Sequence, residues 1–124
     1  MDHPIPLAHE RLDAYHVARE FIGRVADLRR QFRRGEAPLA DQLTRAADSV
    51  LLNLCEGAGR RAGREKARFF DIARGSATEC AAVAEIAGIR RLAPAPALRD
   101  IRDLAGRLVA LLSGLARSAR QRSP

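Results

Sequence analysis

The spacing of apolar residues along the chain predicts helices rather than strands. In the first segment, residues 7–34, apolar positions recur at alternating intervals of four and three, the heptad pattern of a helix that packs lengthwise against others. These positions are Ala14, Ala18, Phe21, Val25, Leu28 and Phe32. Alternation with a period of two, which would indicate strands, does not reach a useful length. The pattern therefore predicts an all-α protein.

Three further segments carry the same period. We expect helices over residues 38–56, 64–89 and 96–118, the second of the four starting at Pro38 and stopping at Gly57. The apolar seams are Leu39, Leu43, Ala46, Val50, Asn53 and Gly57, then Phe69, Ala73, Ser76, Cys80, Val83 and Ala87, then Leu98, Ile101, Ala105, Leu108, Leu112 and Leu115. Because the connections are short, the sequence predicts an antiparallel up-down-up-down four-helix bundle, a single domain over residues 1–124.

A glycine-rich stretch, residues 57–63, separates the second and third segments. Its spacing is GxGxxxG after a helix, whereas a dinucleotide fingerprint needs GxGxxG after a strand, and the GK[ST] end of a P-loop is missing. We therefore interpret it as a helix stop, a reversal near Arg60 and a helix restart near Gly63.

That reversal predicts which residues of the second and third helices face each other. We expect Ser49 beside Ile72 and Ala73, Asn53 beside Arg68 and Phe69, Glu56 beside Arg64 and Arg68, and Ala46 and Ala47 beside Gly75 and Ser76. A glycine within a helix costs about 1 kcal/mol relative to alanine, so Gly75 is expected to have a packing role. Asn53 has two interpretations: a satisfied core amide, or a contact to a ligand or another subunit.

Charge adds a candidate function to this bundle. The chain has 124 residues, with 22 basic against 15 acidic, a net charge of +7, and Lys66 is the single lysine among the arginines. Guanidinium groups suit phosphate, so nucleic acid or an anionic surface is a plausible partner. The alternative is an ordinary solvated surface, with arginine in place of lysine because a GC-rich coding sequence favours arginine codons.

In an antiparallel bundle the basic residues collect at two ends. One end holds Arg29, Arg30, Arg33, Arg34, Arg90, Arg91, Arg99 and Arg102, and the other holds Arg60, Arg61, Arg64, Lys66, Arg68, Arg117, Arg120 and Arg122. Such clusters suit sequence-independent binding to nucleic-acid phosphates. Aromatic residues are only 4 % of the chain, so base stacking is a weaker expectation. The candidate nucleic-acid-binding residues are Arg29, Arg30, Arg33, Arg34, Arg60, Arg61, Arg64, Lys66 and Arg68.

Other chemistry finds little support in the sequence. The histidines are His3, His9 and His16, and a single Asp13-x-x-His16 is half of what a di-iron bundle would need, so we expect no metal and no cofactor. No base is expected near Cys55, and Glu56 and Glu79 are expected to satisfy arginines rather than to act as an acid–base pair, so we expect no enzyme.

The remaining features bear on location. Cys55 and Cys80 are expected to be small buried hydrophobes in a reducing compartment. The N-terminal segment lacks the apolar region of a signal peptide, and no run of 18 apolar residues would span a membrane. We therefore expect a cytoplasmic protein without a membrane partner.

The central segments "QLTRAADSVLLNLCEGAGR" and "KARFFDIARGSATE" resemble the four-helix bundle family encoded in intervening sequences of bacterial 23S rRNA genes. Its wider superfamily includes the accessory variability determinant of diversity-generating retroelements. The matching residues are Gln42, Leu43, Arg45, Ala46, Ala47, Ser49, Asn53, Glu56 and Gly57, then Lys66, Phe69, Ala73, Gly75, Ser76 and Glu79.

The resemblance implies a homopentameric ring and no catalytic activity. It also implies a nucleic-acid-binding role, with a reverse transcriptase as partner in the retroelement branch. Two hypotheses follow: an oligomeric, nonenzymatic accessory protein that binds RNA or DNA, or a self-assembling scaffold whose partner is a protein such as a reverse transcriptase.

Overall fold

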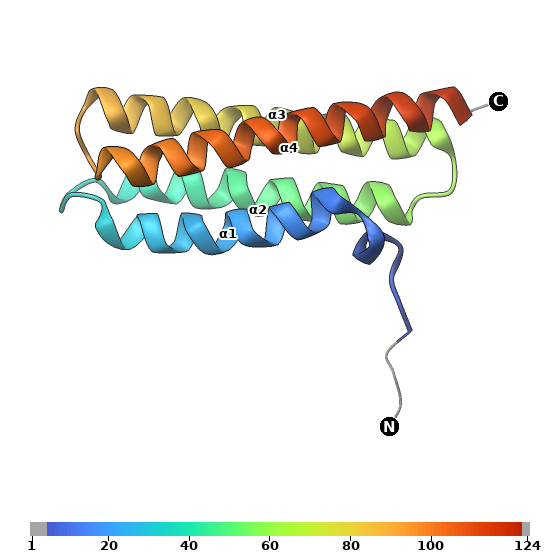
Figure 1. Cartoon of the computed structure of the whole chain (residues 1–124), viewed down its shortest axis with the longest axis horizontal. Coiled ribbons are helices and arrows are strands. Elements are labelled where there is room, and N and C mark those ends of the chain that lie inside the picture. The colour runs from blue at the N-terminus through green and yellow to red at the C-terminus, as the bar shows by residue number, and fades with distance from the viewer. Residues whose placement is uncertain (1–4, 123–124) are drawn as a thin grey trace.

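The computed structural model describes residues 5–122, which form helices and no strand. A short 3-10 helix, η1 (Ala8–Arg11), precedes four α-helices, and Figure 1 shows how they follow one another along the chain. These are α1 (Asp13–Gln31), α2 (Ala37–Gly59), α3 (Gly63–Ile89) and α4 (Ala95–Arg122). The predicted all-helical class, with four helices, is confirmed.

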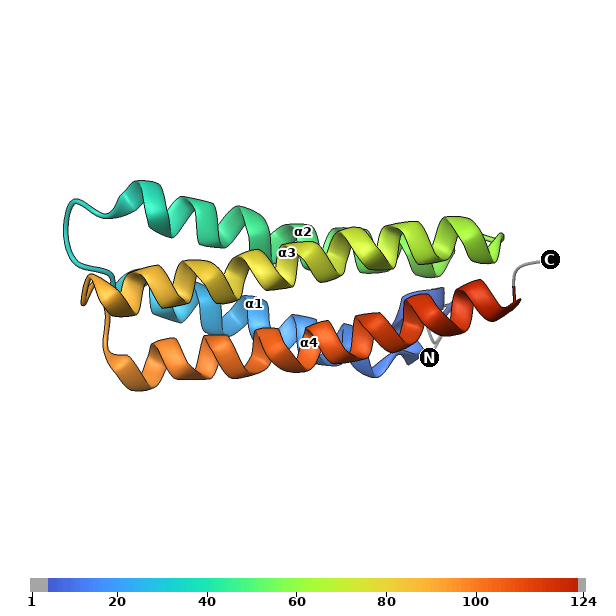
Figure 2. The ribbon, with the colours of Figure 1, turned by 90° about the horizontal axis from the view of Figure 1, so that it is seen from above.

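The four helices lie side by side, and consecutive ones are joined at alternate ends (Figures 1 and 2). Helix α1 packs against α2 and α4, and α3 packs against the same two, so α1 and α3 lie diagonally across the molecule. The connection between α2 and α3, together with η1 and the end of α4, lies at one end of the molecule, which we call the α2–α3 end. The connections between α1 and α2 and between α3 and α4 lie at the opposite end.

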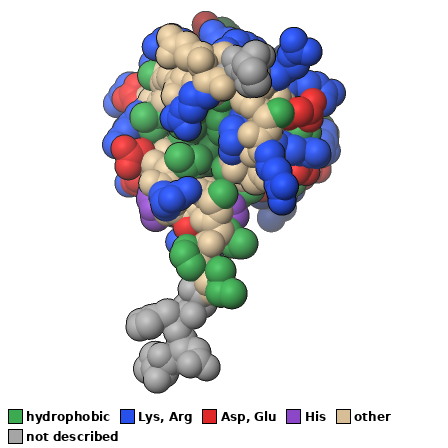
Figure 3. Space-filling view, turned by 90° about the vertical axis from the view of Figure 1, so that its right-hand side faces the viewer, with side chains coloured by type: hydrophobic (Ala, Val, Ile, Leu, Met, Phe, Trp, Pro, Cys, Tyr) green, Lys and Arg blue, Asp and Glu red, His purple; other side chains and the backbone are tan. Residues whose placement is uncertain are grey.

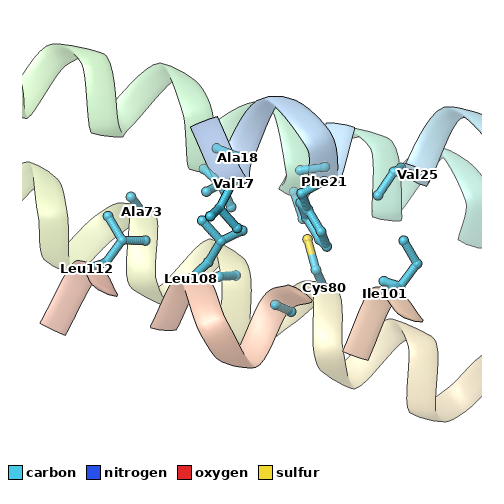
Figure 4. Close-up of a cluster of buried hydrophobic side chains, with 14 of the residues drawn as sticks. Val17, Ala18, Phe21, Val25, Ala73, Cys80, Ile101, Leu108 and Leu112 are labelled. Carbon is cyan, nitrogen blue, oxygen red and sulfur yellow. The ribbon is translucent and has the colours of Figure 1, made fainter. Parts of the chain in front are cut away.

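The core is built from small and medium side chains. Figure 4 shows Phe21 and Val25 of α1, Cys80 of α3 and Leu108 of α4 pointing into the space between the helices. The predicted seams of α1 and α4 are buried except at one end of each, where Phe32 and Leu115 are half-buried. The heptad pattern therefore located the core face of both helices correctly.

The predicted seam of α3 is wrong at two positions. Phe69 and Ser76 are half-buried, whereas the neighbouring Phe70 and Ala77 are buried. Small apolar residues recur all around α3, so more than one stripe fits the helical period. The direction in which α3 faces the core is decided by the helices around it.

The sequence predicted that the second helix stops at Gly57, and this prediction is wrong. Helix α2 continues to Gly59, and Gly57 is buried within it. A Cβ atom at Gly57 would lie 2.9 Å from Cε1 of Phe70 and 3.0 Å from Cβ of Phe69. The glycine therefore permits a close approach between α2 and α3, and the reversal is left to residues 60–62.

The facing residues of α2 and α3 consequently differ from the prediction by about one helical turn. The Oγ atoms of Ser49 and Ser76 lie 2.8 Å apart, whereas Ser49 was expected beside Ile72. The expected packing role of Gly75 is also wrong for this chain, because Gly75 is exposed and a Cβ there would meet nothing within 4 Å.

The ends of the outer helices also differ from the predicted bounds. Helix α1 begins at Asp13 and ends at Gln31, and Gly35, with φ of 92°, lies in the loop beyond it. Helix α3 ends in a Schellman arrangement, with the N–H of Leu92 donating to the Ala87 carbonyl at 2.9 Å and Arg91 in the left-handed region at φ 56°. Helix α4 continues past residue 118 to Arg122.

Candidate nucleic-acid interface

The α2–α3 end brings together basic side chains from four places in the sequence. They come from η1, from the connection between α2 and α3, from the first turn of α3 and from the last turn of α4. Figure 3 looks onto this end, where Lys and Arg side chains surround a group of hydrophobic side chains near its centre.

A cavity of about 350 Å³ opens between these elements. Its charged lining consists of Arg11, Arg61, Lys66 and Arg122. Its apolar lining includes Leu12, Ala58, Ala62, Phe70, Leu115 and Ala119. Among residues 5–122, no Asp or Glu lines the cavity and none forms an ion pair with its four cations. We call this set the cationic cavity.

Lys66 occupies the most constrained position in the cationic cavity. Its ammonium group donates to the carbonyl of Ala58 at 2.8 Å and lies 3.5 Å from that of Gly57, so it satisfies the last carbonyl groups of α2. Burial lowers the pKa of Lys66, and the charges of Arg122 and Arg11 lower it further. The ammonium group thus lies within the repulsive field of two guanidinium groups.

The other predicted basic residues of this end lie outside the cavity. Arg60 pairs with Glu56 at 3.3 Å, and its guanidinium carbon lies 4.9 Å from the centre of the Phe69 ring. Arg68 approaches the same ring at 5.5 Å. The ion pair found for Glu56 is therefore with Arg60, rather than with Arg64 or Arg68 as expected, and Phe69 supports two exposed cations.

The remaining arginines at this end differ in how far their charge is neutralised. Arg120 forms an ion pair with Asp71. Arg122 donates to Ser118 Oγ at 3.0 Å, a neutral partner. Arg64 and Arg117 are exposed, and neither has an ion-pair partner within the described part of the chain.

The opposite end is a weaker candidate because two of its four candidate binding residues, Arg29 and Arg30, form ion pairs. Arg29 forms an ion pair with Asp41 and donates to Thr44 Oγ1 at 3.2 Å. Arg30 pairs with Asp27 at 2.6 Å. Arg33 and Arg34 are exposed and have no ion-pair partner in residues 5–122. Half of the predicted cluster Arg29–Arg34 is therefore neutralised inside the chain.

Polar residues that match the family resemblance form a seam between α2 and α3. Asn53 Nδ2 donates to the Ser49 carbonyl at 2.9 Å and lies 3.0 Å from Ser49 Oγ, which contacts Ser76. Gln42 Nε2 lies 3.5 Å from Glu79 Oε2. Asn53 and Ser76 are half-buried, so the amide is satisfied within its own helix at the edge of the core rather than in the core.

Of the two cysteines expected to be buried, Cys80 of α3 is buried, whereas Cys55 of α2 is half-buried. Burial, followed by the charge of Glu79, raises the pKa of Cys80 to about 12, and burial also raises the pKa of Cys55. His16 Nε2 lies 3.0 Å from the Glu10 carbonyl, and His3 lies outside the described residues. Within residues 5–122, no group of three potential metal-binding side chains is present.

Arg11 is the residue of this site that the sequence-based clusters omitted. It lies at the last position of η1, before the first helix of the bundle, and it reaches the cavity because η1 packs against α2. The predicted antiparallel topology could have revealed it, because the start of α1 must lie at the same end as the connection between α2 and α3.

These features define an all-helical protein with one strongly cationic end and a polar seam between its two central helices. The 23S rRNA-intervening sequence protein family matches residues 10–114, and the chain belongs to that family. No curated protein matches the chain. None of the helices in residues 5–122 is long and apolar enough to cross a membrane.

Proposed function

We propose that this protein is a nonenzymatic, oligomeric accessory protein that binds nucleic acid through the phosphates of its backbone. The observation that carries the proposal is the cationic cavity, where Arg11, Arg61, Lys66 and Arg122 meet without a carboxylate from the described chain. Arg64, exposed beside it, extends the charge over the surface. The family's name refers to 23S rRNA, which makes RNA the first probe to use.

Binding of this kind is expected to be sequence-independent. Arginine contacts to phosphate oxygens release condensed counterions, so the logarithm of the affinity should fall linearly with the logarithm of the salt concentration. On duplex DNA the slope is about −0.9 for each phosphate neutralised. A slope that corresponds to several phosphates would indicate that several basic residues of the cluster bind the same nucleic acid.

The test is fluorescence anisotropy with labelled RNA and labelled duplex DNA at low and near-physiological salt. The variant Arg60→Glu, Arg61→Glu, Arg64→Glu reverses three charges on the connection between α2 and α3. The matched control, Arg30→Glu, Arg33→Glu, Arg34→Glu, makes the same charge change at the opposite end. We expect the first variant to lose most of the affinity and to flatten the salt dependence, and the second to lose much less.

Circular dichroism of both variants is the folding control, and both should keep the helical signal because all six arginines are exposed. Wild-type protein that binds neither probe at low salt would refute the proposal. A folded first variant that binds as well as wild type would move the interface to the opposite end, where Arg29–Arg34 lie.

The second candidate function is a self-assembling scaffold that binds a protein, such as a reverse transcriptase. A specific observation favours it: Leu52 of α2 and Ile72, Ile86 and Ile89 of α3 are exposed, at 69, 40, 37 and 76 %. Large apolar side chains exposed on two neighbouring helices can contribute to an interaction surface. The homopentameric ring implied by the resemblance is one way to cover them.

Two further expectations stay part of this proposal. The protein acts without a metal or cofactor, and it catalyses no reaction itself. Cys55 and Cys80 are free thiols, which suits the reducing cytoplasm, where we propose that the protein acts.

A further inference from the structure

We infer that the cationic cavity binds a phosphate monoester, supplied either by the terminal phosphate of a nucleic-acid strand or by a free nucleotide. The inference deepens the proposed function, and it rests on that function for the strand end as a source of the phosphate. It assigns to this end of the molecule a preference that binding along a nucleic-acid backbone would not produce.

The shape of the site favours an end group over a continuous backbone. Arg60, Arg64 and Arg68 are exposed on the surface around the connection and can reach any phosphate of a strand. The four cations of the cavity instead surround a recess of about 350 Å³. That volume falls in the range of roughly 300–1,000 Å³ that is typical of small-molecule sites. A strand end or a mononucleotide can enter such a recess, whereas the middle of a duplex cannot.

The charge of the site favours a monoester over a diester. A backbone diester carries one negative charge, whereas a phosphate monoester carries about 1.5 to 2 at neutral pH and offers three terminal oxygens. Arg11, Arg61, Lys66 and Arg122 gather four positive charges there, with no acidic residue of the described chain in the lining. The ligand that balances this site best therefore has the higher charge and the larger number of acceptors.

The surroundings of Lys66 support the same conclusion. Its ammonium group has three hydrogens, and the protein acceptors within reach of it are the carbonyls of Ala58 and Gly57. Burial and the two neighbouring guanidinium groups disfavour its charged form, as the lowered pKa shows. A phosphate group in the cavity would relieve that repulsion.

The apolar lining gives the rest of the ligand a place to bind. Phe70, Leu115 and Ala119 belong to the lining of the cavity. On this end of the molecule, Lys and Arg side chains surround hydrophobic ones (Figure 3). A ribose and base attached to the phosphate can cover this surface, and the guanidinium planes of Arg61 and Arg122 offer a face for the base. Inorganic phosphate alone would use only the cations.

The experiment compares matched pairs of probes on the full chain at near-physiological salt. The first pair is one single-stranded RNA with a 5′-phosphate or a 5′-hydroxyl, measured by anisotropy with the dye at the 3′ end. The second pair is AMP and adenosine, measured by isothermal titration calorimetry. We expect the 5′-phosphate to tighten binding by roughly tenfold or more, since one charge-assisted hydrogen bond contributes at least that factor.

The variants separate the cavity from the surface around it. Arg61→Gln with Arg122→Gln removes two exposed cations of the cavity without touching the core, and it should abolish the preference for the 5′-phosphate. Lys66→Met should do the same if it folds. The matched control is Arg64→Gln with Arg68→Gln, which lie outside the cavity lining and should weaken both RNAs equally.

Each outcome decides a different claim. If both RNAs bind equally in wild type and AMP binds no better than adenosine, the inference is overturned while the proposed function stands. If AMP binds but adenosine and both RNAs do not, and Arg61→Gln with Arg122→Gln abolishes AMP binding, the cavity is a nucleotide site and the proposed function fails. If none of the probes binds, even when the measurement is repeated at low salt, both fail.

Discussion

Gly57 is a residue at which α2 and α3 pack closely, because it has no side chain to separate them. Its position is set by Phe70, whose ring occupies the space where a Cβ atom would lie, at 2.9 Å. Gly23 and Gly75 also lie within helices, yet a Cβ atom at either would meet nothing within 4 Å. Three glycines in similar helical sequence therefore have opposite energetic roles, and only Gly57 is required by packing.

The first prediction compares two glycine substitutions. Gly57→Ala should lower the free energy of unfolding by roughly 1–3 kcal/mol, because the added methyl group must displace the Phe70 ring. Gly23→Ala, in α1, should raise it by up to about 1 kcal/mol, because alanine favours the helix and the space there is open. Urea denaturation followed by circular dichroism measures both, and a neutral Gly57→Ala would show that α2 and α3 are further apart.

At the scale of the element, the contact of Ser49 with Ser76 marks how α2 and α3 are aligned. Both hydroxyls are satisfied in this half-buried seam, where Asn53 also donates to Ser49. Gly75, the residue just before Ser76, is exposed and therefore lies outside the seam. Two adjacent positions of α3 therefore lie in different environments, Ser76 in the half-buried seam and Gly75 on the exposed surface.

The second prediction uses these two adjacent positions. Ser76→Leu should destabilise the fold by roughly 1–3 kcal/mol, because a larger side chain must enter the seam and Ser49 loses its partner. Gly75→Leu should leave the stability unchanged or raise it, because the space is open and leucine favours the helix. Thermal unfolding of the two variants is the measurement. Should Gly75→Leu be the more damaging of the two, the alignment described here would be incorrect.

The whole molecule presents two distinct surfaces. One is the α2–α3 end, where basic residues from four elements meet around a cavity. The other is the outer side of α3, which exposes Ile72, Ile86 and Ile89. These surfaces suit different partners, since the proposed phosphate ligand would bind the first through charge and an apolar protein surface would cover the second.

The third prediction concerns self-association. Light scattering at micromolar concentration should give a mass several times the 13.6 kDa of one chain, and five copies if the implied pentamer forms. Ile72→Arg with Ile86→Arg should shift the protein toward the monomer, because two charges would be buried in the contact. The matched control is Ala26→Arg on α1, an exposed residue of the helix diagonal to α3. Wild-type protein that elutes as a clean monomer contradicts the prediction.

The sequence by itself determined the helical class and much of the core. Heptad spacing placed the buried faces of α1 and α4, from Ala14 to Leu28 and from Leu98 to Leu112, because each has one broad apolar stripe. The residue types of the central segments of α2 and α3 indicated the family to which the chain belongs. The candidate basic residues were visible as well, since charge can be read directly from the residue types.

Only the tertiary structure decided how those residues are used. The sequence suggests a helix stop at Gly57, yet α2 continues through it to Gly59, and Phe70 occupies the space where a Cβ atom of residue 57 would lie. Phe69 and Phe70 fit the helical period equally well, and the neighbouring helices select Phe70 for the core. The cationic cavity joins Arg11, Arg61 and Arg122, which are distant in sequence. Local spacing determines which face a helix can bury, but the distances between charges depend on how the helices pack.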